Sequence, residues 1–283
     1  MGFASFRDYV DEYNQGQNWY STWRKIPSQA TTAGVWTDLS MSPGNPVPNY
    51  YASEPLVAAT INGGKGLYTG GNVSPYTKHL KTLTAITVTA AAVPLDFILC
   101  DYLLYYPFID MSVTDPQILD NTVTLPRYSS GNGVMVIAVE VATQIGGQTF
   151  QISYTNQNGV SGRTSKTVTC NAITSTGTLI QTNTATAGSN GPFIPLQTGD
   201  TGVRSIQSLT MNGSDVGLIS LVLVKPIASH VIRAIDAPAE RDYLIDFPSL
   251  PRIYDGAYLN FIALPNGSLA AAPIYGDIQV VWG

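Results

Sequence analysis

The sequence predicts a mainly β fold: an antiparallel β-sandwich or jelly-roll-like body with an N-terminal helix and an extended arm. Several short runs alternate apolar and polar residues, as strands do when one face is buried. Asn-Gly pairs begin at positions 62, 132, 158, 190, 212 and 266, and such pairs favour the tight turns that join antiparallel strands. Only 12% of the 283 residues are charged, about half the usual share of roughly 25%. A protein with so few charged residues must cover its surface with hydroxyls and amides or with neighbouring subunits.

The clearest strands lie between residues 133 and 155. Residues 134–141 form an almost unbroken apolar run, whereas residues 149–155 alternate strictly, with Phe150, Ile152 and Tyr154 on one side. The Gly-Gly pair at 146–147 between them predicts a β-hairpin. Because the first strand is apolar on both faces, we expect it inside a sandwich or against a neighbouring subunit.

Further strands follow from the same signals. The apolar and aromatic stretch 97–111 contains Pro107, which predicts a buried strand followed by an extended segment. Residues 203–211 and 218–224 flank the Asn212-Gly213 pair, and residues 258–264 and 274–282 flank Asn266-Gly267. Both arrangements predict hairpins. Residues 174–191 are rich in Thr, Ser, Asn, Gly and Ala, which is typical of an exposed loop.

The first 55 residues differ from the rest. Ser5 and Asp8 have the spacing of a capping box, and apolar residues recur at helical spacing, so we expect a helix over residues 2–13. Residues 29–51 predict one strand around Val35-Trp36-Thr37, followed by a run with Pro43, Pro46 and Pro48 that predicts an extended linker or arm. We therefore divide the chain into a helix and arm, 1–55, and a β body, 56–283, which forms one sandwich or two sub-sandwiches.

Large rings are unusually frequent near the start of the chain, and they need a surface that buries them. They dock either on the body of this protein or on another subunit, and residue patterns leave both alternatives open. On the second alternative the rings would be interface anchors. These candidate interface residues are Phe3, Phe6, Trp19, Tyr20, Trp23 and Trp36.

The sequence contains no recognisable group of residues that would form a catalytic or metal-binding site. His79 and His230 lack the neighbouring ligands that a metal site needs, and Cys100 and Cys170 lie in strand-like runs, which predicts buried free thiols. No serine elbow or facing carboxylate pair is recognisable. We therefore predict no catalytic, cofactor-binding or metal-binding residues, and no enzyme.

Charge and hydropathy also bear on partners. The formal net charge is −5 and the 14 Lys and Arg residues are scattered. The sequence therefore has no basic cluster of the kind that binds nucleic acid. The longest uncharged apolar-leaning run, residues 82–95, is too short to span a bilayer, and no secretory signal begins the sequence. We expect neither nucleic acid nor membrane as a partner.

Four pairs of motifs give the chain a family resemblance. They are Gly70-Gly71-Asn72-Val73-Ser74 with Thr77-Lys78-His79-Leu80; Gly191-Pro192-Phe193-Ile194-Pro195-Leu196 with Gly199-Asp200-Thr201-Gly202-Val203-Arg204-Ser205; Ala239-Glu240-Arg241-Asp242 with Pro248-Ser249-Leu250-Pro251-Arg252; and Ile274-Tyr275-Gly276 with Trp282-Gly283. With these motifs the chain resembles virion structural proteins of tailed bacteriophages over nearly its whole length.

The resemblance implies a place in the phage particle and no enzymatic chemistry. Within the particle we expect the head: a cement or decoration protein that is made in the host cytoplasm, binds the major capsid protein and forms a homo-oligomer, with a trimer favoured. A tail, collar or head–tail connector component is the alternative within the virion. A carbohydrate-binding or receptor-binding β module, using loops such as 174–191, is the alternative from another class.

Overall fold

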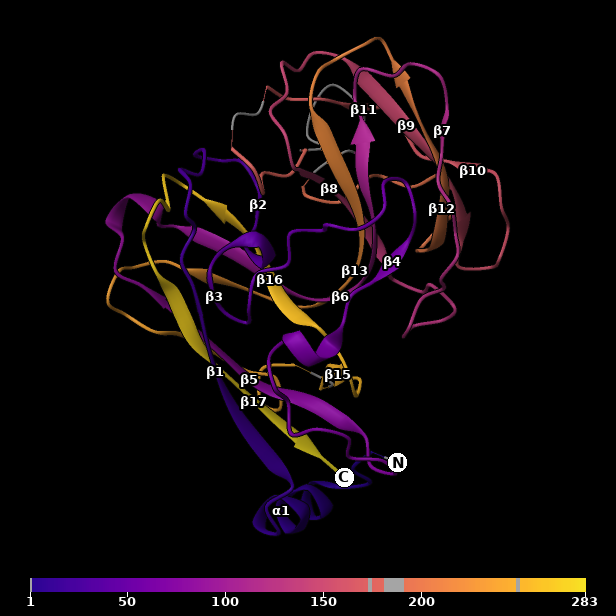
Figure 1. The fold of residues 1–283 in the computed structure, drawn as a ribbon. Coiled ribbons are helices and arrows are strands. Elements are labelled where there is room, and N and C mark those ends of the chain that lie inside the picture. The colour runs from indigo at the N-terminus through magenta and orange to yellow at the C-terminus, as the bar shows by residue number, and fades with distance from the viewer. Residues whose placement is uncertain (1, 173–174, 181–190, 248–249) are drawn as a thin grey trace.

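A computed structural model describes residues 2–172, 175–180, 191–247 and 250–283, and it confirms the mainly β, antiparallel sandwich with an N-terminal helix. Within these residues the helices are α1 (Phe6–Asn14) and three short 3₁₀ turns: η1 (Leu39–Met41), η2 (Gly63–Lys65) and η3 (Ala90–Ala92). Half of the predicted capping box is present: the Ser5 side chain accepts a hydrogen bond from the Asp8 amide, whereas the Asp8 carboxylate accepts from the Ala4 amide and not from the Ser5 amide. The chain has two lobes, with α1 and both termini at the lower end of Figure 1.

The described strands form three sheets (Figure 1). The lower sheet has the order β14 (Ala239–Asp242), β5 (Lys78–Thr87), β17 (Ile274–Trp282), β1 (Asn18–Lys25), β3 (Gly44–Asn45), with β15 (Arg252–Ile253) beside β5. The central sheet has the order β2 (Thr37–Asp38), β16 (Leu259–Pro265), β6 (Leu95–Asp110), β13 (Leu218–Ile232), β8 (Met135–Glu140), with β4 (Ala59–Thr60) beside β6. The upper sheet has the order β10 (Arg163–Thr164), β9 (Thr149–Asn156), β12 (Val203–Asn212), β7 (Gln117–Ile118), with β11 (Val168–Thr169) beside β9.

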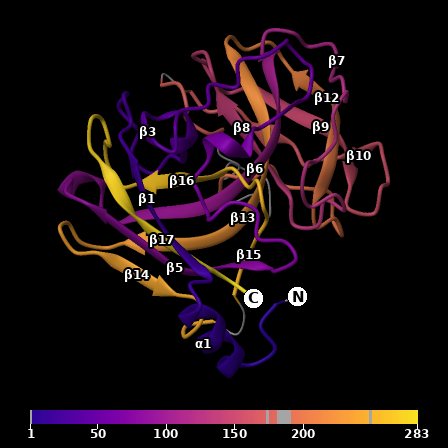
Figure 2. The same ribbon diagram turned by 60° about the horizontal axis from the view of Figure 1, so that its bottom comes forward.

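The two lobes share the central sheet, whose longest strands, β6 and β13, run through both (Figure 2). One face of this sheet packs against the upper sheet to form the first core and against the lower sheet to form the second. The opposite face carries a third core, to which the segments around Trp36, Tyr51 and Leu179 contribute. The predicted two-faced apolar strand is β8, with Val136 in the first core and Ile137 in the third.

Strand β6 continues through Pro107, where the sequence predicted that the strand would end. The pairing register between β6 and β13 shifts between Ile109 and Tyr106. Pro107 therefore lies at a bulge, where its missing amide hydrogen removes no regular ladder bond. The next residue, Phe108, has a φ of 55°, and the strand resumes its pairing at Ile109.

A buried ion pair lies on the face of β6 that carries the first two cores. Asp101 is fully buried, and it follows Leu99 of the second core and precedes Leu103 of the first. The Arg127 guanidinium donates to both carboxylate oxygens, with distances of 2.8 and 2.7 Å. The Tyr258 amide donates to the same carboxylate at 3.0 Å. The carboxylate is thus fully engaged at the junction of the two lobes.

The predicted hairpins around positions 146, 212 and 266 are wrong. β8 and β9 lie in different sheets, as do β12 and β13, and β16 and β17. The glycine-containing turns carry the chain from one layer of the sandwich to the other. Because alternation specifies which side of a strand is buried but not its hydrogen-bonded neighbour, both arrangements fit the same pattern. The Asn158-Gly159 turn does lead into a paired neighbour, with Arg163 of β10 opposite Tyr154 of β9.

The N-terminal segment 1–55 is built into the body and differs from the arm that the proline content predicted. Strand β1 lies between β17 and β3, and it pairs with β17 along its whole length, from Asn18 opposite Val281 to Lys25 opposite Ile274. Strand β2 belongs to the central sheet. The buried side chains at alternate positions of β1 explain why this segment forms a strand.

The ion pair at the lobe junction gives a stability prediction. The Arg127→Ala variant leaves the Asp101 carboxylate buried without its charged partner, which costs about 3–5 kcal/mol in the free energy of unfolding. Urea denaturation followed by circular dichroism measures this loss. The matched control is Arg7→Ala, whose side chain is 92% exposed in its pair with Asp11 and whose loss leaves the unfolding curve unchanged. Coincident curves for Arg127→Ala and the wild type would contradict the prediction.

Candidate functional site

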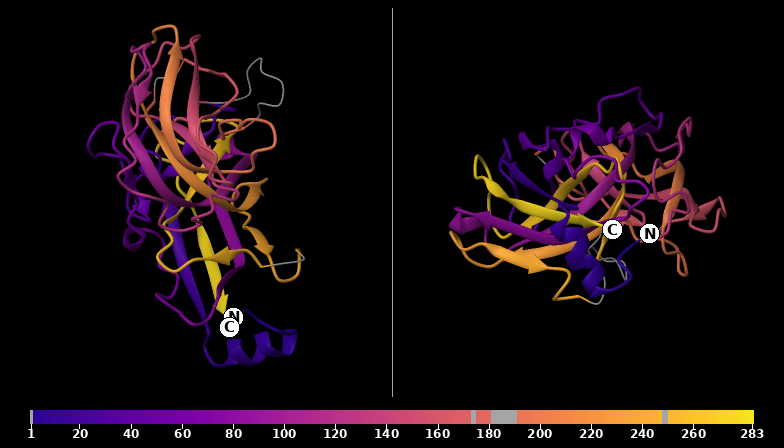
Figure 3. Two further views of the ribbon diagram at one scale, coloured as in Figure 1. Left: turned by 90° about the vertical axis from the view of Figure 1, so that its right-hand side faces the viewer. Right: turned by 90° about the horizontal axis from the view of Figure 1, so that it is seen from below.

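Helix α1 and both termini lie together at one end of the molecule (Figure 3). Several exposed aromatic residues belong to α1, β1 and the loop beside β1 at this end. We call this surface the aromatic tip and define it by Phe6, Trp19, Tyr20 and Tyr68. Their exposed fractions are 70%, 44%, 58% and 60%. Single exposed rings are common on soluble proteins, whereas several at one end are typical of a contact surface.

Local contacts fix the rings of the aromatic tip. The Tyr13 hydroxyl lies 3.2 Å from the Tyr20 hydroxyl and accepts a hydrogen bond from the side-chain amide Nε2 of Gln279 at 2.9 Å, which holds α1 against β1 and β17. Trp19 packs edge-on against Tyr68, with ring centroids 5.2 Å apart. The tip is therefore an ordered surface that is formed before any partner arrives.

The six candidate interface residues divide into two groups. Phe6, Trp19 and Tyr20 are exposed at the tip, and the partly buried Phe3 packs against Tyr9 and His79 close to them. Trp23 lies in the second core with 2% exposure and Trp36 in the third with 7%. The last two rings are part of this protein's own interior and are not available as anchors. The sequence reasoning missed Tyr68, which a loop brings beside Trp19.

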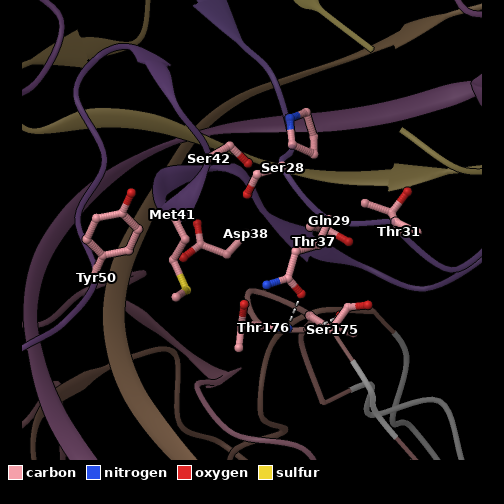
Figure 4. A pocket seen from close by; sticks show the side chains of 13 residues that line it. Ser28, Gln29, Thr31, Thr37, Asp38, Met41, Ser42, Tyr50, Ser175 and Thr176 are labelled. Carbon is pink, nitrogen blue, oxygen red and sulfur yellow. Dashed lines mark hydrogen bonds between the residues drawn. The ribbon is translucent and has the colours of Figure 1, made fainter. Parts of the chain in front are cut away.

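A polar recess of about 130 Å³ opens beside β2 and η1 (Figure 4). Hydroxyl-bearing side chains dominate its lining, and the side-chain oxygen Oε1 of Gln29 accepts a hydrogen bond from the Thr176 backbone amide across it. Its volume is well below the about 300–1,000 Å³ of typical small-ligand pockets. We therefore regard it as a packing feature.

The Asp38 carboxylate beside this recess is saturated with hydrogen bonds. It accepts from the Ser40 amide and hydroxyl and from the hydroxyls of Tyr51 and Tyr102, all at 2.5 to 2.8 Å. Burial raises the pKa of Asp38, and the four donors oppose that shift. With every lone pair engaged, the carboxylate ties the first 55 residues to β6 and cannot act as a base.

Lys25 is buried at the end of β1, and its ammonium group donates to the carbonyl oxygens of Ser42 and Pro46 at 3.0 and 2.6 Å. Burial lowers its pKa to about 8, and the charge of Asp38 opposes that change. Both contacts are with the connection that leads through β3. The side chain therefore joins β1 to the following segment, and it has no exposed face from which to react.

Other groups with catalytic potential lie apart from one another. His79 bonds the Leu250 carbonyl through Nδ1 at 3.2 Å, and His230 packs beside Phe97. Both cysteines are buried free thiols, as predicted. In the part of the chain that the structure describes, no three His, Cys, Asp or Glu side chains converge on a common point, and no helix is long and apolar enough to cross a membrane. The predicted glycan-binding loop, 174–191, lies largely outside the described residues.

Comparison with known proteins finds only weak structural similarity. No family model and no curated protein match the chain. Two solved structures of VP2 from infectious bursal disease virus are weakly similar. A mutant VP2 in T=1 particles shares 9% identity, with 93% of this chain and 77% of that chain covered and a TM-score of 0.16. A VP2 subviral particle shares 10% identity, with coverages of 92% and 64% and a TM-score of 0.13. A likeness to a viral capsid protein at these TM-scores carries no argument about fold or function.

A buried carboxyl gives a prediction about pH. Glu140 is fully buried at the end of β8, and neither carboxylate oxygen has a hydrogen-bond partner among the described residues. Burial raises its pKa from 4.5 to about 8. The folded state therefore holds this proton more tightly than the unfolded state, and stability is lost as the pH rises from 4.5 through about 8.

In the Glu140→Gln variant the side chain at position 140 cannot ionise, so the variant does not lose stability in this way as the pH rises. We expect its stability relative to the wild type to grow between pH 5 and pH 8, with a slope approaching about 1.4 kcal/mol per pH unit. Urea denaturation at several pH values measures the difference. Parallel stability profiles for the two proteins would show that the carboxyl does not titrate in this range.

Proposed function

We propose that this protein is a non-enzymatic structural component of a tailed-phage particle, bound to the capsid shell as a cement or decoration protein. The observation that carries the proposal is the aromatic tip: an ordered group of exposed rings at one end of a rigid β body. The motif resemblance to phage virion proteins and the low share of charged residues support the same function. The partners on this proposal are the major capsid protein and further copies of this chain, in the phage head.

The structure suggests how such a protein would attach. Buried aromatic side chains contribute much of the binding energy in protein interfaces, often about 2 kcal/mol or more each. Phe6 and Tyr20 are the best candidates, because they are the most exposed rings of α1 and β1. A capsid subunit that covers them needs no rearrangement of the sheet behind them, since α1 and β1 are already held by Tyr13 and Gln279.

The quantity that tests the proposal is the copy number of this chain in purified particles. Quantitative mass spectrometry against the major capsid protein should give a ratio near one-to-one or a simple fraction of it. A ratio of a few per cent would contradict a shell position and favour a tail, collar or connector component. Absence from the particles would overturn the virion proposal. The mass of the isolated protein in solution tests the expected trimer.

A surface variant tests the contact itself. We expect the double variant Phe6→Ser/Tyr20→Ser to keep the β body folded, with α1 still held by the bond between Gln279 and Tyr13. It should decorate undecorated capsids with an affinity lower by roughly 30-fold for each ring lost. Sedimentation of capsids with bound protein measures the occupancy. The matched control is Ile118→Ser, because Ile118 is an equally exposed apolar residue, at 69%, in β7 of the upper sheet. Equal occupancy for the double variant and the wild type would exclude the tip as the contact.

A further inference from the structure

The outer face of the lower sheet holds a recess of about 450 Å³ that the aromatic tip does not include. Helix α1 lies at the end of this face, where Tyr13 meets Tyr20 and Gln279, and among the strands that the structure describes the core of the lower sheet is on its other face. The volume falls within the range of small-ligand pockets, and the lining combines apolar surface with a few polar groups, as such pockets do. We call it the sheet recess.

The recess exists because the ladder between β17 and β5 is interrupted. The pairing register includes Tyr275 and Ile278 of β17 but skips Gly276 and Asp277. At this point the Asp277 amide donates to the Thr84 hydroxyl at 2.9 Å, and the Thr84 carbonyl accepts from the Trp23 indole at 3.2 Å. The indole thus reaches from the core between the strands and forms part of the floor.

Gly276 is required for this arrangement. A Cβ atom at that position would collide with the Thr84 carbonyl oxygen, which is the acceptor of the indole hydrogen bond. Trp23 lies directly opposite Gly276 in the register between β1 and β17. The missing side chain therefore lets the strands approach closely while the indole occupies the gap.

The walls of the recess carry polar groups with free hydrogen-bonding capacity. Arg24, Asn45 and Tyr275 stand side by side across three strands, since Arg24 is opposite Asn45 in one register and opposite Tyr275 in the other. Asp277 accepts a hydrogen bond from the Thr84 hydroxyl at 2.6 Å. Within the described residues neither Arg24 nor Asp277 belongs to an ion pair. The Arg24 guanidinium, a planar donor, and the Asp277 carboxylate, a planar acceptor, thus lie on either side of Tyr275.

We propose that the sheet recess binds a neutral pyranose unit of a glycan. A pyranose has one apolar face of C–H groups, which stacks on an aromatic ring such as Tyr275. Its hydroxyls both donate and accept, and pairs of them match the planar carboxylate of Asp277 and the planar guanidinium of Arg24. The two opposite charges cancel, so the recess favours an uncharged ligand. This inference does not depend on the proposed capsid function, and it uses none of the rings of the aromatic tip.

Binding to a printed array of neutral and acidic glycans tests the proposal, followed by titration of the best neutral glycan. The wild type should retain at least one neutral glycan. Tyr275→Ala and Arg24→Ala should each weaken its binding by about tenfold or more, whereas Tyr275→Phe keeps the ring and should bind nearly as well. Tyr76→Ala is the matched control, because Tyr76 is 42% exposed and lies outside the recess. Arg24 is exposed, so its variant tests the site even if Tyr275→Ala unfolds.

Three results would overturn the proposal. The first is that the array retains no neutral glycan. The second is that Arg24→Ala and a folded Tyr275→Ala both bind the neutral glycan as well as the wild type does. The third is binding to acidic glycans alone that is lost in Arg241→Ala, which would assign the site to the neighbouring pocket lined by His230, Arg233 and Arg241.

Discussion

The two lobes depend on the contact between Asp101 and Arg127. A sixteen-residue strand, β6, contributes apolar side chains to one core at each end, and Asp101 lies between Leu99 of the second core and Leu103 of the first. The bidentate pair fills that position and engages the Tyr258 amide and the Tyr102 carbonyl as well. It thereby fixes the connection after Leu125 against two neighbouring strands of the central sheet. A buried charge pair is weak evidence for net stability, but it specifies this one arrangement of the two cores.

Local features of the fold could be predicted from the sequence because local chemistry decides them. The cap of α1 follows from Ser5 and Asp8, and the buried faces of β8 and β9 follow from the spacing of their apolar residues. The partner of each strand could not be predicted. The Asn212-Gly213 turn joins β12 and β13, which face each other across the first core in different sheets. A turn sequence defines a change of direction, whereas long-range packing decides whether the next strand pairs beside the last one or crosses over it.

The same limit applies to the candidate sites. Aromatic content indicated that the N-terminal region meets a surface, but it could not separate Tyr20 and Phe6 from Trp23 and Trp36. Strand pairing determines which side of β1 is buried, and tertiary packing places Trp36 in the third core and leaves Phe6 of α1 exposed. No residue pattern in the sequence predicted the sheet recess. Trp23, Thr84 and Gly276 are distant in the chain, and only the register of three strands brings them together to interrupt one ladder.

The pairing of β1 with β17 has a mechanical consequence. The two strands are antiparallel over eight residue pairs, and the start of β1 and the end of β17 both lie at the aromatic tip. A force applied there along the strands and resisted by the opposite lobe acts parallel to the strand axes. It pulls both strands in the same direction, so the load passes along the backbones of β1 and β17 towards β2 and β16 of the central sheet and does not strain the hydrogen bonds between β1 and β17. A force across the sheet would break the same bonds one after another. The pairing of β1 with β17 therefore resists a pull along the strands better than a pull that separates their two ends at the tip.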